Sequence, residues 1–254
     1  PYSHELIVGI NNNPVTTYFV VVLGIFAMKA VLRKRTPVDV LLIPLFGALV
    51  AFGLTFVLSY PVDYLINQIA QAIDQATILQ PFIMSVVIAV VMGMLLTSPI
   101  SSAAIAIAIQ LSGIAAGAAV IGTTTQMIGF AIQSRKDNNI GMVLSIAFGT
   151  SMLQFKNIIR KPVIWLPTII ASAILGPIFV LLFKTESTRF GAGMGSSGLV
   201  GQLQTLEAMD YSNQAMLVAI LMLVIPLCLV LAIDIIFRRK GLILNGDLKI
   251  SQDI

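Results

Sequence analysis

Long apolar runs separated by short polar or basic stretches are the feature that most constrains how this chain can fold. A helix needs about 20 mostly apolar residues to cross the hydrocarbon core of a bilayer. Of the 254 residues, 57% are hydrophobic and 10% are charged, whereas soluble domains carry roughly 25% charged residues. The composition therefore excludes a soluble enzyme, a disordered chain and a nucleic-acid-binding domain. It predicts an all-α, polytopic integral membrane protein with candidate spans at 15–32, 38–59, 81–97, 101–116, 121–132, 140–155, 163–183 and 214–237.

Basic residues gather in clumps at the ends of these runs, at 33–35, 135–136, 156–161 and 238–240. Short cytoplasmic loops of membrane proteins collect Lys and Arg, so the clumps predict a multi-pass plasma-membrane protein whose tail, 241–254, is cytoplasmic. Basic residues flank both ends of 140–155, and we therefore expect this run to be a re-entrant hairpin. The sequence begins with Pro1 and not with Met, which indicates a processed or truncated chain that could lack an earlier membrane segment.

Three segments do not read as simple spans. Segment 60–80 has apolar residues on one face and polar residues on the other at helical spacing, which predicts an external amphipathic helix on the membrane surface. Segment 117–125 reads GAAVIGTTT, and its Gly and Thr content predicts an unwound stretch between two half-helices. Segment 190–202 reads FGAGMGSSGLVGQ, which predicts a Gly-rich loop, external or re-entrant, within 185–212.

Broken spans carry functional information, because irregular backbone at membrane depth must be buried in protein or line a watery cavity. In transporters, such segments form the substrate path. The starts of 81–97 and 163–183 also share an X-Pro-X-Ile pattern. The two runs cross in opposite directions by the charge rule, so they form a candidate inverted repeat. These features favour a transporter.

Polar side chains in the broken segments are the candidate solute contacts. Four are consecutive: Thr123, Thr124, Thr125 and Gln126. Thr hydroxyls commonly bond back to their own helix, which is the structural alternative to a polar lining. Gln154 and Asn157 form a second polar group, for which an interfacial loop contact is the alternative. The loop, unless it is a loose external linker, offers N–H groups and hydroxyls to an anionic or hydroxylated ligand at Gly193, Gly195, Ser196, Ser197 and Gly198.

Other chemistry finds little support in the sequence. The loop matches the spacing G-x-G-x-x-G, but dinucleotide sites need that motif between a strand and a helix. No acidic residue stands alone within a span as a proton relay would, and Asp234 precedes Arg238 at the spacing of a helical ion pair. The only histidine is His4, and no Cys/His cluster has zinc spacing. We therefore expect no catalytic residue, metal site or cofactor.

Several stretches together resemble a known family. They are TTTQMIGFA at 123–131, the turn at 135–141, the stretch 149–162 and RFGAGMGSSGLVG at 189–201. They resemble the EIIC membrane component of the phosphotransferase system, in particular its second EIIC family, which includes perfringolysin-regulator-like (PfoR-like) proteins. The resemblance covers about 37–203. It implies a sugar-permease-type fold over the single domain 1–254, a bacterial plasma membrane, a homodimer, and separate EIIA and EIIB partners.

Two functions remain open from the sequence. The first is an EIIC-like permease for a sugar or a similar small polar solute, and the second is a membrane-bound regulator or sensor without transport. Whether the protein takes part in phosphotransfer is a separate question. The related sugar-phosphorylating permeases use intramembrane Glu and His, whereas here His4 is near a chain end and Glu207 is expected in a loop, which speaks against it. The expected partners are the lipid bilayer, the solute and EIIA- and EIIB-type proteins, and no nucleic acid.

Overall fold

The protein is almost entirely helical. The structure, a computed structural model, describes residues 14–31 and 39–250. Helices make up 80% of it and the described part contains no β-strand, which confirms the all-α fold class. The chain divides into two compact units, 1–69 and 70–254. The first unit contains α1 (Pro14–Val31) and the beginning of α2 (Asp39–Leu79), while the basic clump at 33–35 lies outside the described residues.

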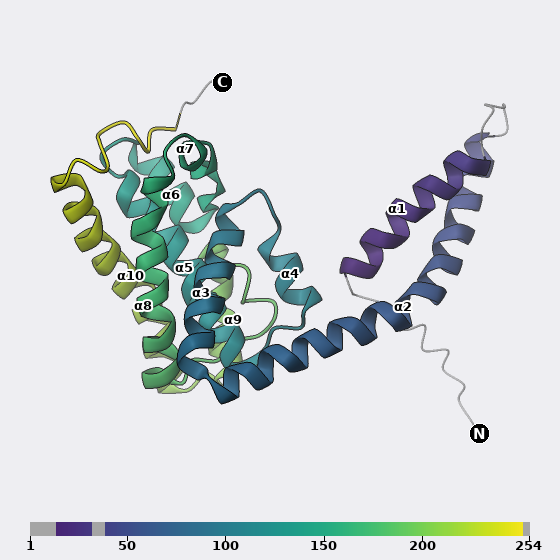
Figure 1. The fold of residues 1–254 in the computed structure, drawn as a ribbon, viewed down its shortest axis with the longest axis horizontal. Helices are drawn as coiled ribbons and strands as arrows, with labels where there is room; N and C mark the ends of the chain where they lie inside the picture. Colours follow the sequence, from purple (N-terminus) through teal and green to yellow (C-terminus); the bar gives the residue numbers. More distant parts are fainter. Residues whose placement is uncertain (1–13, 32–38, 251–254) are drawn as a thin grey trace. The chain divides into compact units, whose positions relative to one another are not determined.

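The second unit is a helical bundle with short connections (Figure 1). Its long helices are α3 (Pro81–Thr97), α5 (Gly113–Ser134), α8 (Leu166–Phe183) and α10 (Asn213–Arg239). Its short helices are α4 (Ser102–Ala108), α6 (Ile140–Phe148), α7 (Phe155–Arg160) and α9 (Val200–Ala208), with single 3-10 turns at η1 (Ser151–Gln154), η2 (Pro162–Trp165) and η3 (Ser197–Leu199).

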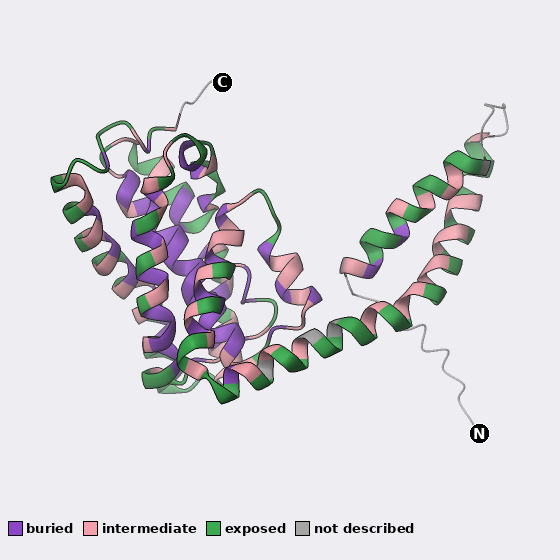
Figure 2. Ribbon diagram, in the orientation of Figure 1, coloured by how far each residue is buried: buried purple, intermediate pink, exposed green. Residues whose placement is uncertain are grey.

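Helix α5 lies at the centre of this bundle and contacts α3, α8 and α10. All its residues from Ala115 to Ala131 are buried (Figure 2). By contrast, α3, α8 and α10 each expose large apolar side chains, such as Phe82, Ile174 and Ile220. In a membrane protein such faces contact lipid, which is as apolar as they are. The bundle therefore shields one central helix with helices that suit the bilayer.

Glycines allow α5 to approach its neighbours closely. A Cβ atom on Gly122 would lie 1.9 Å from the carbonyl oxygen of Ala89 in α3. One on Gly117 would lie 2.0 Å from the carbonyl oxygen of Thr185, after α8. Small residues serve this purpose at helix contacts in membranes. The glycines at the centre of α5 are therefore packing residues.

The prediction of an unwound stretch at 117–125 is wrong, because α5 is continuous from Gly113 to Ser134. The break comes earlier, between α4 and α5, where Gln110 has a positive φ of 51°. The predicted run 101–116 is accordingly not a span, since α4 has only seven residues. The glycines that suggested unwinding instead remove side chains from helix contacts.

Two further segments differ in part from expectation. Pro61 does not begin a separate helix, because α2 continues across it to Leu79; the surface position of 60–80 stays a prediction. The run 140–155 is not one continuous helix, because it is broken into α6 and η1 at Gly149 and Thr150. Its re-entrant position in the membrane stays a prediction, as does the inverted repeat.

Four helical segments in the described part are long and apolar enough to cross a membrane. They are α2, α5, α10 and the continuous stretch Pro162–Phe183, which joins η2 to α8. Two shorter apolar helices, Val15–Ala30 and Pro81–Thr97, accompany them. This set confirms a polytopic membrane protein.

Replacing Gly122 with Ala tests the close approach of α5 to α3. We expect Gly122→Ala to lower the free energy of unfolding by about 1–3 kcal/mol or more, because the added Cβ would force two backbones apart. The control is Gly141→Ala in α6, where an added Cβ meets only Asn139 Oδ1, at 3.5 Å, and where Ala should stabilise the helix by up to about 1 kcal/mol. Thermal unfolding in detergent measures both, and equal melting temperatures would contradict the packing.

Candidate functional site

A hollow of about 400 Å³ lies where three interruptions of the helical bundle meet. The interruptions are the α3–α4 turn, the break between α6 and η1, and the Gly-rich loop before η3. Pockets for small molecules have volumes of roughly 300–1,000 Å³. The lining residues are Leu96, Pro99, Ile100, Ser101, Ser102, Ala103, Gly149, Thr150, Met152, Gly193, Met194 and Ser197.

The local sequence explains the first two interruptions. Pro99 follows the end of α3 and has no N–H with which to continue a helix. Ser101 then begins α4 by accepting the N–H of Ala104 at 3.2 Å. After α6 ends at Gly149, Thr150 begins η1 by accepting the N–H of Met152 at 3.1 Å. Hydroxyl side chains are preferred at helix starts for this reason, and here they also face the hollow.

The third interruption, the Gly-rich loop, is packed into the bundle. A Cβ on Gly193 would lie 2.5 Å from the Cα of Ala103, and the Ser102 hydroxyl donates to the Gly193 carbonyl at 2.7 Å. Ser196 is fully buried and donates to the Ala147 carbonyl at 2.6 Å. The loop is therefore fixed to both α4 and α6.

Two glycines of the loop have backbone conformations that favour this residue. Gly195 and Gly198 have φ of 54° and 53°, in the left-handed region that Gly adopts without strain. Gly195 also packs on the backbone of Thr123 and Thr124, where a Cβ would come within 2.7 Å. The loop therefore rests directly on the central helix.

Three of the residues that line the hollow have hydroxyl protons to donate. The Ser101 and Thr150 hydroxyls accept backbone N–H groups, and neither donates to a described residue. The Ser197 hydroxyl makes no hydrogen bond with any residue that the structure describes. No charged side chain is among the lining residues. Such a site suits a neutral ligand with several hydroxyl groups.

A buried polar cluster adjoins the walls of the hollow. Thr97 and Ser151, whose sequence neighbours Leu96, Thr150 and Met152 line the hollow, lie with their hydroxyl oxygens 2.9 Å apart. Thr97 also donates to Gln126 Oε1 at 3.5 Å. The cluster therefore connects the hollow to the central helix.

Gln126 is the centre of that cluster. Its Oε1 accepts hydrogen bonds from Trp165 Nε1 at 3.0 Å and from Thr168 Oγ1 at 2.8 Å. Its Nε2 is buried and has no partner among the described residues. An unpaired buried polar group costs about 1–3 kcal/mol, so this amide has capacity for a ligand or a water molecule.

The three threonines before Gln126 do not share one lining, because successive helix residues point about 100° apart. Thr123 bonds back to the carbonyls of Ala119 and Val120, at 2.8 and 3.1 Å. Thr124 accepts from Gln202 Nε2 at 3.1 Å, towards α9. The Thr125 hydroxyl is buried without a described partner. The Thr123 hydroxyl thus bonds back to its own helix, which is the structural alternative to a polar lining. Thr125 and Gln126 each have a buried polar group without a hydrogen-bond partner among the described residues.

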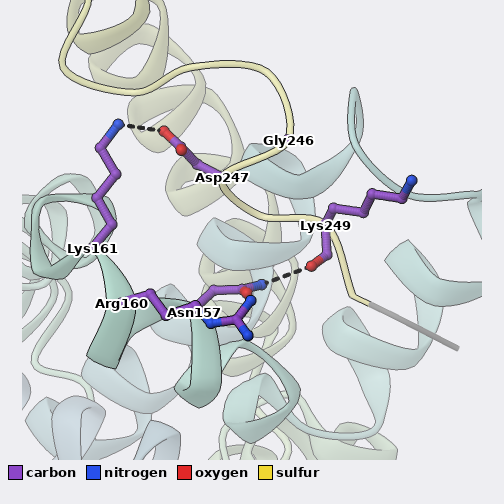
Figure 3. Close-up of a pocket in the computed structure, with 6 residues that line it drawn as sticks. All are labelled: Asn157, Arg160, Lys161, Gly246, Asp247 and Lys249. Carbon is purple, nitrogen blue, oxygen red and sulfur yellow. Dashed lines mark hydrogen bonds and ion pairs between the residues drawn. The ribbon is translucent and has the colours of Figure 1, made fainter. Parts of the chain in front are cut away.

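Gln154 and Asn157 contact the tail of the chain and not the hollow. Gln154 Nε2 donates to the Leu248 carbonyl at 2.9 Å, and Asn157 Nδ2 donates to the Lys249 carbonyl at 3.1 Å (Figure 3). The two amides also bond to each other at 2.8 Å. Both side chains therefore hold the backbone of the segment 245–250, which we call the tail strap.

Charged and amide groups after α5 hold the tail strap from a second side. Asp137 accepts the N–H groups of Gly246 and Leu248, at 2.9 and 3.1 Å. Asn138 donates to the Leu248 carbonyl at 2.7 Å and accepts the N–H of Ile250 at 2.9 Å. Leu248 is fully buried. The surrounding side chains thus bond to the backbone of the strap, as a receptor groove bonds to the backbone of a peptide.

The buried acid of α10 is paired, as its spacing predicts. Asp234 lies 3.1 Å from Arg238 and, in addition, 3.0 Å from Arg135. The second partner was not predictable, because it lies 99 residues away in sequence. Ser212 begins α10 by accepting the Ala215 N–H, and Glu207, which was expected in a loop, lies within α9.

Sequence reasoning missed several members of the site. Thr97 and Ser101 stand at the ends of predicted spans on either side of Pro99, and Thr150 and Ser151 follow Gly149 inside the predicted span 140–155. Hydroxyl residues next to a helix-ending Pro or Gly are a usable signal of such a lining, but their convergence depends on the fold. Within the described residues, no three His, Cys, Asp or Glu side chains gather as a metal site would.

Comparison with known families decides the membership of this chain. A family model described as "Phosphotransferase system, EIIC" matches residues 2–250. The chain belongs to this EIIC family. It is therefore a membrane permease component related to the phosphotransferase system, and EIIC components work with EIIA and EIIB components. Searches of curated proteins and of solved structures returned no significant match.

The acid of the tail strap is electrostatically stabilised in its charged form. Burial by itself raises the pKa of the Asp247 carboxyl, but the Lys161 ammonium, which lies 2.6 Å away, the Leu244 N–H and the Arg238 charge together outweigh it. The pKa of Asp247 is therefore lowered below its ordinary value. The pair stabilises the folded state above that ordinary value, about 3.9, and this contribution is lost as the pH falls through the lowered pKa.

Replacing Asp247 with Asn tests the direction in which pH changes the contribution of this ion pair to stability. We expect Asp247→Asn to be less stable than the natural EIIC chain at pH 7 by about 0.2–1 kcal/mol, the range for partly exposed ion pairs. The difference should shrink as the pH falls below the ordinary pKa of an Asp carboxyl and through the lowered pKa of Asp247. Asp210→Asn is the control, because no ion pair of Asp210 is described and Asn tolerates its positive φ. Thermal unfolding of the full chain measures both, and a difference that grows at low pH would contradict the assignment.

Proposed function

We propose that this EIIC-family protein is a permease for a sugar or a similarly small, neutral, hydroxyl-rich solute. The solute occupies the hollow between the α3–α4 turn, η1 and the Gly-rich loop. The observation that carries the proposal is the convergence of three hydroxyls with uncommitted protons, on Ser101, Thr150 and Ser197, in an uncharged hollow. Hydroxyl donors without a competing charge select a neutral polyol over an ion.

Within this proposal, the residues of the predicted site have different roles. Gly193 and Ser197 line the hollow, and Gly195, Ser196 and Gly198 shape the loop that carries them. Thr125 and Gln126 are contacts for an inner position of the solute, since each has a buried polar group without a described partner. Thr123 and Thr124 support the helix and the loop, and Gln154 and Asn157 support the tail strap.

The route of the solute follows the polar groups inside the bundle. From the hollow it passes the Thr97–Ser151 hydroxyl pair and reaches the Gln126 amide. Each of these groups can bond to a solute hydroxyl, which both donates and accepts. Such bonds replace those that the solute loses on leaving water, where lipid offers none.

The cellular setting is part of the same proposal. The protein is a homodimer in a bacterial plasma membrane, with its C-terminal tail in the cytoplasm and EIIA- and EIIB-type proteins as partners. The membrane-embedded helices and the family membership support this setting. Two basic residues bond to the tail strap, Lys161 to Asp247 and Arg238 to Asn245, as the positive-inside rule expects of a cytoplasmic face.

A solute screen with the purified full chain tests the proposal. Thermal shift against unphosphorylated hexoses, pentoses and disaccharides identifies the binding solute, and uptake of the same labelled solute into proteoliposomes measures transport. We expect at least one sugar to bind and to enter the vesicles. Binding without uptake would favour the alternative of a membrane-bound regulator or sensor. The absence of both would overturn the proposal.

Replacing Ser197 with Ala tests the hollow itself. This hydroxyl has no described protein partner, so its removal should leave the melting temperature unchanged. We expect solute affinity to fall about 3–10-fold, which corresponds to one neutral hydrogen bond. The matched control is Ser145→Ala in α6, whose exposed hydroxyl bonds back to the Gly141 carbonyl at 2.9 Å. Equal affinities in the two variants would place the solute elsewhere.

A further inference from the structure

A second hollow, of about 350 Å³, lies between the end of α7 and the tail strap (Figure 3). Asn157, Arg160 and Lys161 form one side of it, and Gly246, Asp247 and Lys249 form the other. Unlike the uncharged hollow described above, its lining includes three basic residues and one acidic residue. Its charges therefore indicate a different class of ligand.

The carboxylate of this hollow is already engaged. Asp247 Oδ2 accepts from Lys161 Nζ at 2.6 Å and from the Leu244 N–H at 2.6 Å. This ion pair neutralises one cation and the acid together. Arg160 and Lys249 remain, so the lining residues carry a net charge of about +2.

The two remaining cations have free donors. No hydrogen bond or ion pair of the Arg160 guanidinium or of the Lys249 ammonium is formed with a described residue. Figure 3 shows the Lys249 ammonium extending away from Asp247. The backbone of Lys249 is fixed by Asn157, while its four-carbon stem leaves the ammonium able to turn towards a ligand.

Phosphate is the anion that this arrangement fits. A guanidinium presents a planar fork of N–H donors that binds phosphate through two parallel hydrogen bonds, and Lys adds a mobile point charge. A phosphate group carries one to two negative charges at neutral pH, which matches the unbalanced charge of the lining. Basic pockets at the cytoplasmic side of membrane proteins also bind the phosphates of lipid headgroups.

We propose that the hollow beneath the tail strap is a binding site for a phosphate-bearing anion, held by Arg160 and Lys249. The anion is either a lipid headgroup or a free phosphate compound, and both present the same group to these residues. The site does not depend on the solute hollow or on transport, because it shares no lining residue with that hollow.

Binding to the full chain tests the proposal. One probe is inorganic phosphate at constant ionic strength, added to the chain in detergent. The other is phosphatidylglycerol, tested by comparing the chain in phosphatidylcholine nanodiscs with and without this lipid. The test variant is Arg160→Gln with Lys249→Gln. The matched control is Arg239→Gln with Lys240→Gln, which removes two exposed cations outside the lining. Melting temperature is the readout, and both variants should match the natural chain without a probe.

Saturable stabilisation by inorganic phosphate, weakened at least about tenfold in the test variant and unchanged in the control, supports a site for a free anion. Stabilisation by phosphatidylglycerol alone, lost only in the test variant, supports a lipid headgroup. Stabilisation by neither probe would overturn the proposal. An equal loss in both variants would also overturn it, because it would show general attraction to a basic face.

Discussion

The burial of α5 is the constraint on which the rest of the structure depends. Of the long helices in the bundle, it carries the most polar groups near its middle, and a lipid environment offers those groups no hydrogen bonds. The bundle meets this constraint by surrounding α5 with α3, α8 and α10. That enclosure is possible because Gly117 and Gly122 bring backbones into direct contact. Larger residues there would separate the helices and open gaps beside the polar groups.

The candidate site follows from the same constraint. A polar helix inside an apolar shell needs polar neighbours, and these come from places where the surrounding helices end. Gln126 and its partners have three such polar neighbours: Thr97 at the end of α3, Ser151 in η1 and Trp165 in η2. The same helix ends leave space that side chains do not fill, which is the hollow near Ser101 and Ser197. Hydrogen bonding of the core and access for a solute thus have one structural origin.

The sequence predicted the elements whose signals are local. The bounds of α3 coincide with the predicted run, because Pro81 begins it and Pro99 follows its end. The membrane class and the Asp234–Arg238 pair were predictable for similar reasons. Whether 117–125 is helical or unwound was not predictable from the sequence, because Gly promotes either a break in a helix or a close contact between helices. Here the close contact of Gly122 with the backbone of Ala89 decides for a continuous helix.

The site was predictable only in its residue types. Ser196 and Ser197 are identical neighbours, yet the first is buried against Ala147 and the second faces the hollow. Gln154 and Asn157 are suited to a solute or to a peptide backbone, and their partners lie more than 90 residues away. Such assignments depend on contacts between distant parts of the chain, which local patterns do not encode.

The turn η1 connects the two hollows of the bundle. At its beginning, Ser151 joins the polar cluster around Gln126, and at its end Gln154 holds the Leu248 carbonyl of the tail strap. Both residues belong to η1, a turn of only four residues, so the wall of the solute hollow and the support of the strap lie in one short stretch of backbone. Consequently the tail strap is part of what fixes the shape of the solute hollow, although none of its residues lines it.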